Sequence, residues 1–208
     1  MAPAQAKNES RPRDFLGGQM LIAMPNMRDP RFERSVLIMC AHDAERAMGV
    51  IVNKPLADVE LGELLDQLRI DPREGVGGDA VYFGGPVATE RGLVLHTLDY
   101  RLDSTLALAD DVGLTASREI LVDIGGRDGK RPPPSRFMIA IGHAGWGPGQ
   151  LESEFASNAW VHAEADVGLI FSERPSATWK LALERLGVTG AMLSPEWSAP
   201  RPGDAPLN

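Results

Sequence analysis

Short apolar runs separated by polar turns dominate the first part of the chain. Residues 35–41 and residues 48–52 are apolar or β-branched, and the polar segment 42–46 lies between them. This pattern predicts the two strands of a hairpin with a longer loop, and strands adjacent in sequence are expected to pair. A shorter apolar run at residues 19–23 ends before Pro25 and predicts an earlier strand.

The same pattern predicts strands in the remainder of the chain. Residues 80–83 and residues 92–97 are expected to form a second hairpin, and Gly84, Gly85 and Pro86 open the loop between them. Glycine and proline at that place favour a turn over a continuing strand. The other predicted strands are residues 104–109, 137–141, 160–163 and 167–171.

A helical period replaces the strand pattern in four places. The clearest is residues 61–68, where Leu61, Leu64, Leu65 and Leu68 share one helical face and Asp71-Pro72 supplies the stop. A second helix is expected to begin at Thr115 or Ser117 and to end before Gly125. The other two predicted helices carry Leu151 with Phe155, and Trp179 with Leu183 and Leu186.

Most predicted strands come in hairpin pairs with helices interspersed. The sequence therefore predicts an α/β fold of the α+β type, a mixed, largely antiparallel sheet with about four packed helices. A length of 208 residues favours one domain over two. Residues 1–14 and residues 194–208 are rich in proline, alanine and charge, so we expect two flexible tails around a single domain at residues 15–193.

Composition narrows the classes of function. Apolar residues make up 43% of the chain and charged residues 24%, as in ordinary globular proteins. The net charge is −8, with +2 on residues 1–34 and −10 on the rest. Such an acidic body lacks the electrostatic attraction that binding to phosphate backbones needs, so direct nucleic-acid binding is not expected. No stretch has the apolar length of an export leader or a membrane span, and the chain is expected to be cytoplasmic.

Thiol and imidazole chemistry is sparse. Cys40 is the only cysteine and closes an apolar run, so an internal disulfide is excluded and the thiol is expected to be buried and inert. No histidine stands three or four residues from another, and neither a metal ion nor another cofactor is predicted. His42 lies beside Asp43 in the first hairpin loop and is expected to face solvent. The other histidines are His96, His143 and His162.

Residues 142–150, Gly-His-Ala-Gly-Trp-Gly-Pro-Gly-Gln, lie between a predicted strand and a predicted helix. Backbone N–H groups in such a loop could hold an anion or a nucleotide. The segment lacks the Gly-Lys-Ser/Thr ending of a P-loop and the glycine spacing of dinucleotide-binding folds. A tight structural turn with Trp146 over glycines is therefore preferred, in which Gly145 and Gly147 need positive φ angles or a close neighbour.

Four stretches occur in a fixed order along the chain. They are FLGGQ to MPNMRDPRFERSV within residues 15–36, AMGVIVNKPL at residues 47–56, FGGPV at residues 83–87 and GHAGWGPGQLE at residues 142–152. Together they resemble the AlgH/YqgE family of bacterial proteins. The resemblance implies a single α/β domain in the bacterial cytoplasm, in a family sometimes labelled as transcriptional regulators, and it brings no established catalytic residue with it.

The sequence favours a non-enzymatic binding or regulatory module that contacts an unknown protein or small ligand, because no nucleophile, metal cluster or cofactor motif is recognisable. Any influence on transcription would then be indirect. The alternative is an enzyme whose site is assembled from the glycine-rich segment and the scattered histidines. Loops at strand ends are expected to form one shared surface. Its candidate residues are Asn53, Lys54, Gly84, Gly85, Pro86, His143, Gly145, Trp146, Gly147 and Gln150.

Overall fold

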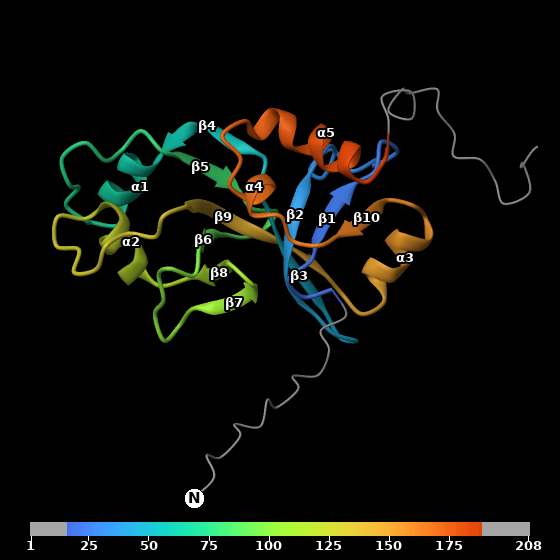
Figure 1. Ribbon diagram of the computed structural model, residues 1–208, viewed down its shortest axis with the longest axis horizontal. Coiled ribbons are helices and arrows are strands. Elements are labelled where there is room, and N and C mark those ends of the chain that lie inside the picture. The colour runs from blue at the N-terminus through green and yellow to red at the C-terminus, as the bar shows by residue number, and fades with distance from the viewer. Residues whose placement is uncertain (1–15, 189–208) are drawn as a thin grey trace, which may run out of the picture.

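The computed structural model describes residues 16–188, which form ten strands and five helices (Figure 1). The strands are β1 (Met20–Ala23), β2 (Val36–His42), β3 (Ala47–Ile51), β4 (Pro55–Glu60), β5 (Ala80–Phe83), β6 (Val87–His96), β7 (Leu106–Ala109), β8 (Val112–Thr115), β9 (Phe137–Trp146) and β10 (Trp160–Ala163). The helices are α1 (Leu61–Gln67), α2 (Arg118–Gly125), α3 (Gln150–Ala156), α4 (Val167–Ile170) and α5 (Pro175–Arg185). The tails expected at residues 1–14 and 194–208 lie outside the described residues.

The strands form one mixed sheet in the order β10-β1-β2-β3-β9-β6-β8-β7, and β5 joins it beside β9 with β4 paired to β5. Every pair along the main path is antiparallel, whereas β5 and β9 run parallel. The first part of β9 pairs with β5 and β6, and its last three residues pair with β3. This arrangement confirms the predicted α+β class, and it makes β9 the strand that joins the two halves of the sheet.

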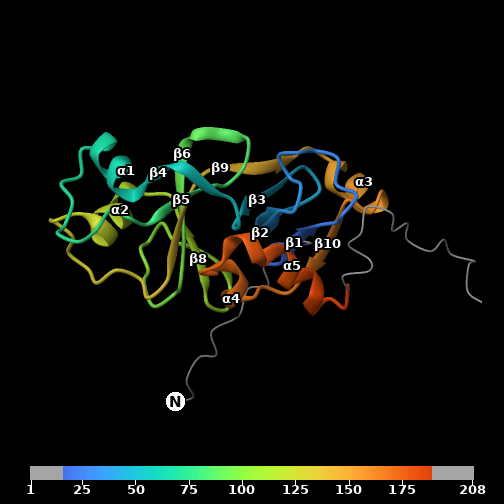
Figure 2. The same ribbon diagram turned by 90° about the horizontal axis from the view of Figure 1, so that it is seen from above.

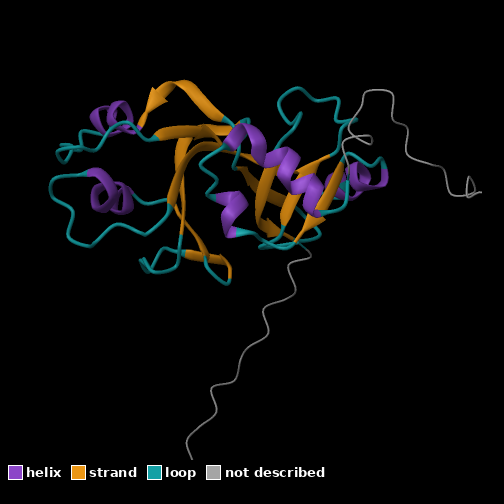
Figure 3. Ribbon diagram, turned by 45° about the horizontal axis from the view of Figure 1, so that its top comes forward, coloured by secondary structure: helices purple, strands orange, loops and turns teal. Residues whose placement is uncertain are grey.

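The helices cover different parts of the sheet and complete three apolar clusters. Leu169 of α4 and Leu183 of α5 are buried against β1 and β2. Leu61 of α1 and Ile120 of α2 pack on the first part of β9, and Leu151 of α3 packs near its end. Figures 2 and 3 show α4 and α5 together on one face of the sheet, with α1 and α2 at the opposite end of the molecule from α3. Within residues 16–188, no helix is both long enough and apolar enough to cross a bilayer.

Several predicted elements are confirmed. The first hairpin is present as β2 and β3, with Leu37 opposite Ile51. The leucine spacing gives α1, in which Leu61 and Leu65 are completely buried. Leu68 was placed on the same face, but it is 39% exposed because it forms the C-cap beyond the last turn. The helices α2, α3 and α5 also lie where their apolar spacing predicted them.

The strand predicted at residues 167–171 was wrong, because residues 167–170 form α4. Asp166 caps this helix, with its side-chain Oδ1 accepting a hydrogen bond from the N–H of Leu169 at 3.0 Å. The apolar run is too short to display a helical period, and the aspartate before it was the missed signal. The strands β4 and β8 were not predicted. The hairpin expected from residues 80–83 and 92–97 was also wrong, because β5 and β6 each pair with β9 and not with each other. Thr115 ends β8, and Ser117 is the N-cap of α2.

The glycine-rich segment is mostly strand, which corrects the prediction of a tight turn. β9 continues to Trp146 because β3 pairs with residues 144–146. Sequence reasoning ended the strand early because glycines are unfavourable in strand interiors, whereas here the ladder with a neighbouring strand compensates. The turn that remains ends at Gly149, whose φ of 69° places it in the left-handed region as the N-cap of α3.

The backbone also requires glycine at other positions than expected. Gly145 and Gly147 do not have positive φ angles, and a Cβ on Gly147 would meet nothing within 4 Å. Gly142 has a φ of 73°, and Gly85 has a φ of 148°. A Cβ on Gly85 would lie 2.2 Å from the carbonyl carbon of His143. The close approach of two backbones therefore occurs where the loop after β5 crosses β9.

Candidate functional site

The loop after β5 is bound between two strands of the sheet. The carbonyl oxygen of Gly84 accepts a hydrogen bond from the N–H of Ile51 at 2.9 Å, and the N–H of Gly84 donates to the carbonyl oxygen of Ile141 at 2.8 Å. Gly84 thus links the end of β3 to the middle of β9. A side chain at this position would collide with the β9 backbone, which gives both Gly84 and Gly85 a structural role.

Asn53 and Lys54 hold the loop between β1 and β2 in place. Asn53 is only 8% exposed; its Oδ1 accepts from the N–H of Val36 and its Nδ2 donates to the carbonyl oxygen of Arg34, both at 2.8 Å. Lys54 Nζ donates to the carbonyl oxygen of Arg31 at 2.8 Å, and burial lowers the pKa of this ammonium group. Both side chains therefore act on the loop rather than on a ligand.

The loop between β1 and β2 forms one wall of a cavity of about 570 Å³, which we call the Trp146 cavity. The opposite wall comes from the start of β6, the end of β9 and α3. Four of the candidate residues line it, namely Pro86, Gly145, Trp146 and Gln150. The other lining residues are Asn26, Met27, Arg28, Asp29, Arg31, Phe32, Val87, Glu154, Ser157 and Ala159.

Trp146 is the centre of an aromatic cluster beneath this cavity. Its ring is stacked on Phe32 with 6.3 Å between centroids, and it meets Trp160 edge to face at 6.0 Å. Glu154 Oε2 accepts the indole N–H of Trp146 at 2.9 Å and that of Trp160 at 2.7 Å, while Gln150 Nε2 donates to Glu154 Oε1 at 2.9 Å. One carboxylate of α3 therefore fixes both indole rings.

The charged groups on the loop side of the cavity are partly paired. Arg31 contacts the carboxylate of Asp29 through two nitrogens, and this hydrogen bonding lowers the pKa of Asp29. The guanidinium of Arg31 also lies 5.7 Å from the centroid of the Phe32 ring. Arg28, in contrast, lines the cavity and makes no ion pair or side-chain hydrogen bond within residues 16–188.

His143 and Gly147 lie close to the cavity without lining it. His143 is opposite Val87 in the β6–β9 ladder, and burial together with the charge of Arg91 lowers the pKa of its imidazole. The N–H of Gly147 donates to Gln150 Oε1 at 3.2 Å, which closes the turn before α3. Within the described part of the chain, the His143 ring makes no hydrogen bond to a carboxylate of the kind that orients a catalytic histidine.

The prediction that His42 faces solvent was wrong. Its side chain is 5% exposed, and its Nε2 lies 2.9 Å from Glu152 Oε1 of α3. The pKa of Glu152 is lowered by its own backbone N–H and by this contact with His42. Cys40 is buried as predicted, and burial raises the pKa of its thiol to about 12. A thiol with that pKa is not a nucleophile at neutral pH.

Sequence reasoning missed the wall formed by residues 26–32 and the role of Glu154. Residues 26–32 were part of a quoted stretch, yet their turn-forming composition gave no sign of a binding wall. Glu154 was not among the candidate residues, because helical spacing alone does not show that two distant indoles converge on it. Residues 16–188 contain no group of three or more His, Cys, Asp or Glu side chains arranged to hold a metal ion.

Comparison with known proteins places this fold in a family. Residues 20–191 match the family model described as AlgH-like. The chain belongs to the AlgH-like family. A UPF0301 protein of Caulobacter vibrioides is 48% identical over 87% of this chain and 92% of its own length, and one of Azorhizobium caulinodans is 46% identical over 93% and 97%.

Solved structures agree with the assignment to the AlgH-like family. The solution structure of the AlgH protein from Pseudomonas aeruginosa is similar with a TM-score of 0.70 and 34% identity, covering 92% of this chain and 99% of that one. A crystal structure of a Corynebacterium diphtheriae protein has a TM-score of 0.64 at 23% identity, covering 82% and 86% of the two chains, and shows a shared fold. The resemblance inferred from the four stretches is thus confirmed.

Proposed function

We propose that this AlgH-like chain is a non-enzymatic binding module whose ligand site is the Trp146 cavity. The observation that carries the proposal is the cavity itself, with a volume of about 570 Å³ and walls from segments distant in sequence. Sites for small organic molecules commonly measure about 300–1,000 Å³. The walls are held by specific contacts, from Asn53 and Lys54 on the loop side and from Glu154 on the helix side, so the site is largely preformed.

The lining suggests the chemistry of the ligand. Met27, Phe32 and Val87 provide apolar surface, and Val87 is 43% exposed. Arg28 offers a guanidinium that can pair with a carboxylate or a phosphate. We therefore expect a ligand with an apolar or aromatic body and one acidic group, supplied either by a small molecule or by a side chain of a partner protein with the same chemistry.

The enzyme alternative has less support in the geometry. Asp29 is occupied by Arg31, and the carboxylate of Glu154 is occupied by two indoles and an amide. These groups are engaged in holding structure, whereas a general acid or base needs a proton that it can exchange with the substrate. A regulatory role would be exerted through the bound ligand or partner, because the acidic body does not attract duplex DNA.

The test fills the cavity without straining the fold. Gly145 is exposed, and a Cβ there would meet only Val87 Cγ2 at an ordinary 3.7 Å, so Gly145→Leu directs a side chain into the cavity. Gly78→Leu is the matched control, since a Cβ there meets nothing within 4 Å and Gly78 does not line the cavity. A fractionated small-molecule extract of bacterial cytosol serves as the probe, with bound compounds detected by native mass spectrometry.

We expect the wild-type chain and Gly78→Leu to retain the same compound and Gly145→Leu to lose it. Thermal unfolding of all three proteins verifies that the fold is intact. The proposal is wrong if the wild type binds neither a compound from the extract nor a purified partner protein. It is also wrong if Gly145→Leu retains the compound undiminished.

A further inference from the structure

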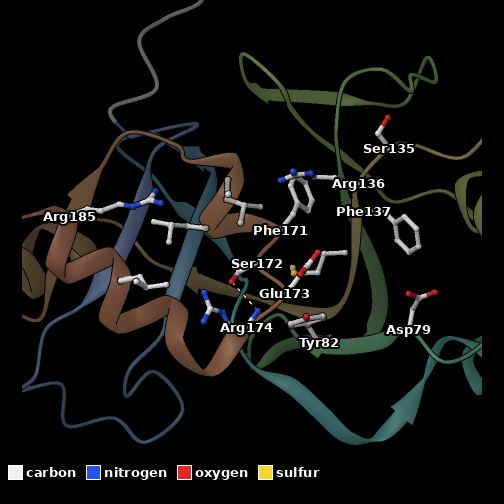
Figure 4. Close-up of a pocket in the computed structure, with 15 residues that line it drawn as sticks. Asp79, Tyr82, Ser135, Arg136, Phe137, Phe171, Ser172, Glu173, Arg174 and Arg185 are labelled. Carbon is white, nitrogen blue, oxygen red and sulfur yellow. Dashed lines mark hydrogen bonds between the residues drawn. The ribbon is translucent and has the colours of Figure 1, made fainter.

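A second cavity, of about 670 Å³, lies between the start of β9 and the helices α4 and α5, and we call it the Tyr82 cavity. It shares no lining residue with the Trp146 cavity. Figure 4 shows the side chains of Arg136 and Phe171 near Glu173, with Tyr82 below them and Phe137 on the opposite wall. Its walls come from segments far apart in the sequence, so the fold itself creates this space.

The Tyr82 cavity is rich in arginine, although the protein is acidic. Its lining carries Arg136, Arg174 and Arg185 against two carboxylates, although the chain as a whole has a net charge of −8. Arg185 is compensated by an ion pair with Asp166. The guanidinium groups of Arg136 and Arg174 make no ion pair or hydrogen bond with any residue in the described range 16–188. Their formal charge is balanced by the carboxylates of Asp79 and Glu173 in the same lining, so an anion is recognised here through the hydrogen bonds of the guanidinium groups and not through an excess of positive charge.

The rest of the lining offers aromatic surface. Tyr82, Phe137 and Phe171 are each partly exposed, and Met138 and Ile170 form buried apolar wall behind them. Burial raises the pKa of the Tyr82 hydroxyl, so this group remains a hydrogen-bond donor at neutral pH. Aromatic side chains that line a cavity can bind planar rings by stacking.

We propose that the Tyr82 cavity binds an aromatic compound that carries a single phosphate group and has the size of a mononucleotide. Arg136 and Arg174 hold the phosphate, because a planar guanidinium matches its oxygens with two parallel hydrogen bonds. The aromatic ring of the ligand lies against Tyr82 and Phe171. Inorganic phosphate alone would leave most of the 670 Å³ unfilled.

The two carboxylates of the lining set a limit on the ligand. Asp79 and Glu173 line the same cavity as the two arginines and make no ion pair within the residues that the structure describes. They can accept hydrogen bonds from sugar hydroxyl or ring amino groups, and they repel additional phosphates. The proposal therefore includes a preference for monophosphates over triphosphates.

Isothermal titration of the full chain with adenosine and guanosine monophosphates tests this site. Adenosine, adenosine triphosphate and inorganic phosphate are titrated in parallel at the same ionic strength. We expect at least one monophosphate to bind, and the three comparison compounds to bind about tenfold more weakly or not at all, since a charge-assisted hydrogen bond contributes about that factor. Arg136→Ala and Arg174→Ala are each expected to weaken monophosphate binding about tenfold as well.

The controls separate this site from general electrostatics and from the Trp146 cavity. Arg101→Ala removes an exposed arginine that lines neither cavity and is expected to leave binding unchanged. Gly145→Leu is also expected to bind the monophosphate normally, so failure of the first proposal leaves this one standing. If Arg136→Ala does not fold, Arg136→Lys retains the charge, loses the paired hydrogen bonds and still weakens binding.

Three results would overturn the proposal. One is the absence of monophosphate binding at millimolar concentration. Another is inorganic phosphate or adenosine triphosphate binding as tightly as the monophosphate. The last is an equal loss of affinity in Arg101→Ala, which would mean that overall charge and not this cavity attracts the ligand.

Discussion

The carboxylate of Glu154 accepts the indole N–H of Trp146 at 2.9 Å, and this contact fixes the ring that forms the floor of the Trp146 cavity. Trp146 is only 5% exposed, so its N–H has little access to water and depends on this acceptor. The same oxygen accepts the indole N–H of Trp160. Helix α3 thereby ties the end of β9 to the start of β10.

Replacing Glu154 with alanine is expected to destabilise the fold by about 2–3 kcal/mol, because two buried indole N–H groups lose their acceptor. Glu154→Gln retains one side-chain oxygen and is expected to cost less than half of that. Chemical denaturation followed by far-UV circular dichroism measures both variants. Glu164→Ala removes an exposed carboxylate of the next loop and is the control, expected within about 0.5 kcal/mol of wild type.

Two glycines of the family stretches are expected to respond in opposite ways. Gly85→Ala places a Cβ 2.2 Å from the backbone of His143 at a φ of 148°, and we expect a loss of roughly 2–4 kcal/mol. Gly147→Ala adds a methyl group in open space at an ordinary φ and is expected within about 0.5 kcal/mol of wild type. The midpoints of chemical denaturation measure the stability of both variants. An equal loss of stability in the two variants would contradict the geometry.

The thiol of Cys40 is expected to resist modification by thiol reagents in the folded protein. It is 6% exposed, and its pKa is raised to about 12 by burial, so almost no thiolate is present at pH 8. Ellman's reagent should therefore react with less than about one tenth of the protein under native conditions. The same protein in guanidinium chloride should react completely, and fast native labelling would show that the strand carrying Cys40 opens readily.

The local elements could be predicted from the sequence, whereas the long-range contacts could not. The hairpin of β2 and β3 and the helix α1 followed from apolar spacing within one segment. The extension of β9 through Gly145 depends on pairing with β3, about 100 residues away, and no local pattern reports it. For the same reason the segment at Val167 was assigned to a strand, since four apolar residues fit either structure.

The candidate surface was also predicted only in part. Trp146, Gln150, Pro86 and Gly145 were singled out and do line one cavity. Asn53 was chosen as a ligand contact but is occupied by backbone groups of the loop before β2. An asparagine that holds a loop and one that binds a ligand look identical in a sequence, because the difference lies in which distant backbone groups reach it.

His96 is expected to make stability depend on pH. Its ring is fully buried, with Nδ1 2.9 Å from the carbonyl oxygen of Thr97 and Nε2 2.8 Å from the hydroxyl of Thr115. Burial lowers the pKa of this imidazole below its ordinary 6.5, so the unfolded chain binds the proton more readily than the folded one. The contribution of His96 to the free energy of unfolding is therefore fully present above pH 6.5 and decreases as the pH falls below that value.

Urea denaturation of the wild type and of His96→Gln at pH 7.5, 6.5 and 5.5 measures this effect. We expect His96→Gln to be less stable at pH 7.5, because the glutamine fits the hydrogen bonds with Thr97 and Thr115 less well, but to lose less stability than the wild type between pH 7.5 and 5.5. His143→Gln is the comparison, since its pKa is also lowered but its ring is less buried, and it should reduce the pH dependence by a smaller amount. Identical pH dependence in the wild type and His96→Gln would mean that the buried ring does not titrate in this range and that the carboxylates alone set the response to acid.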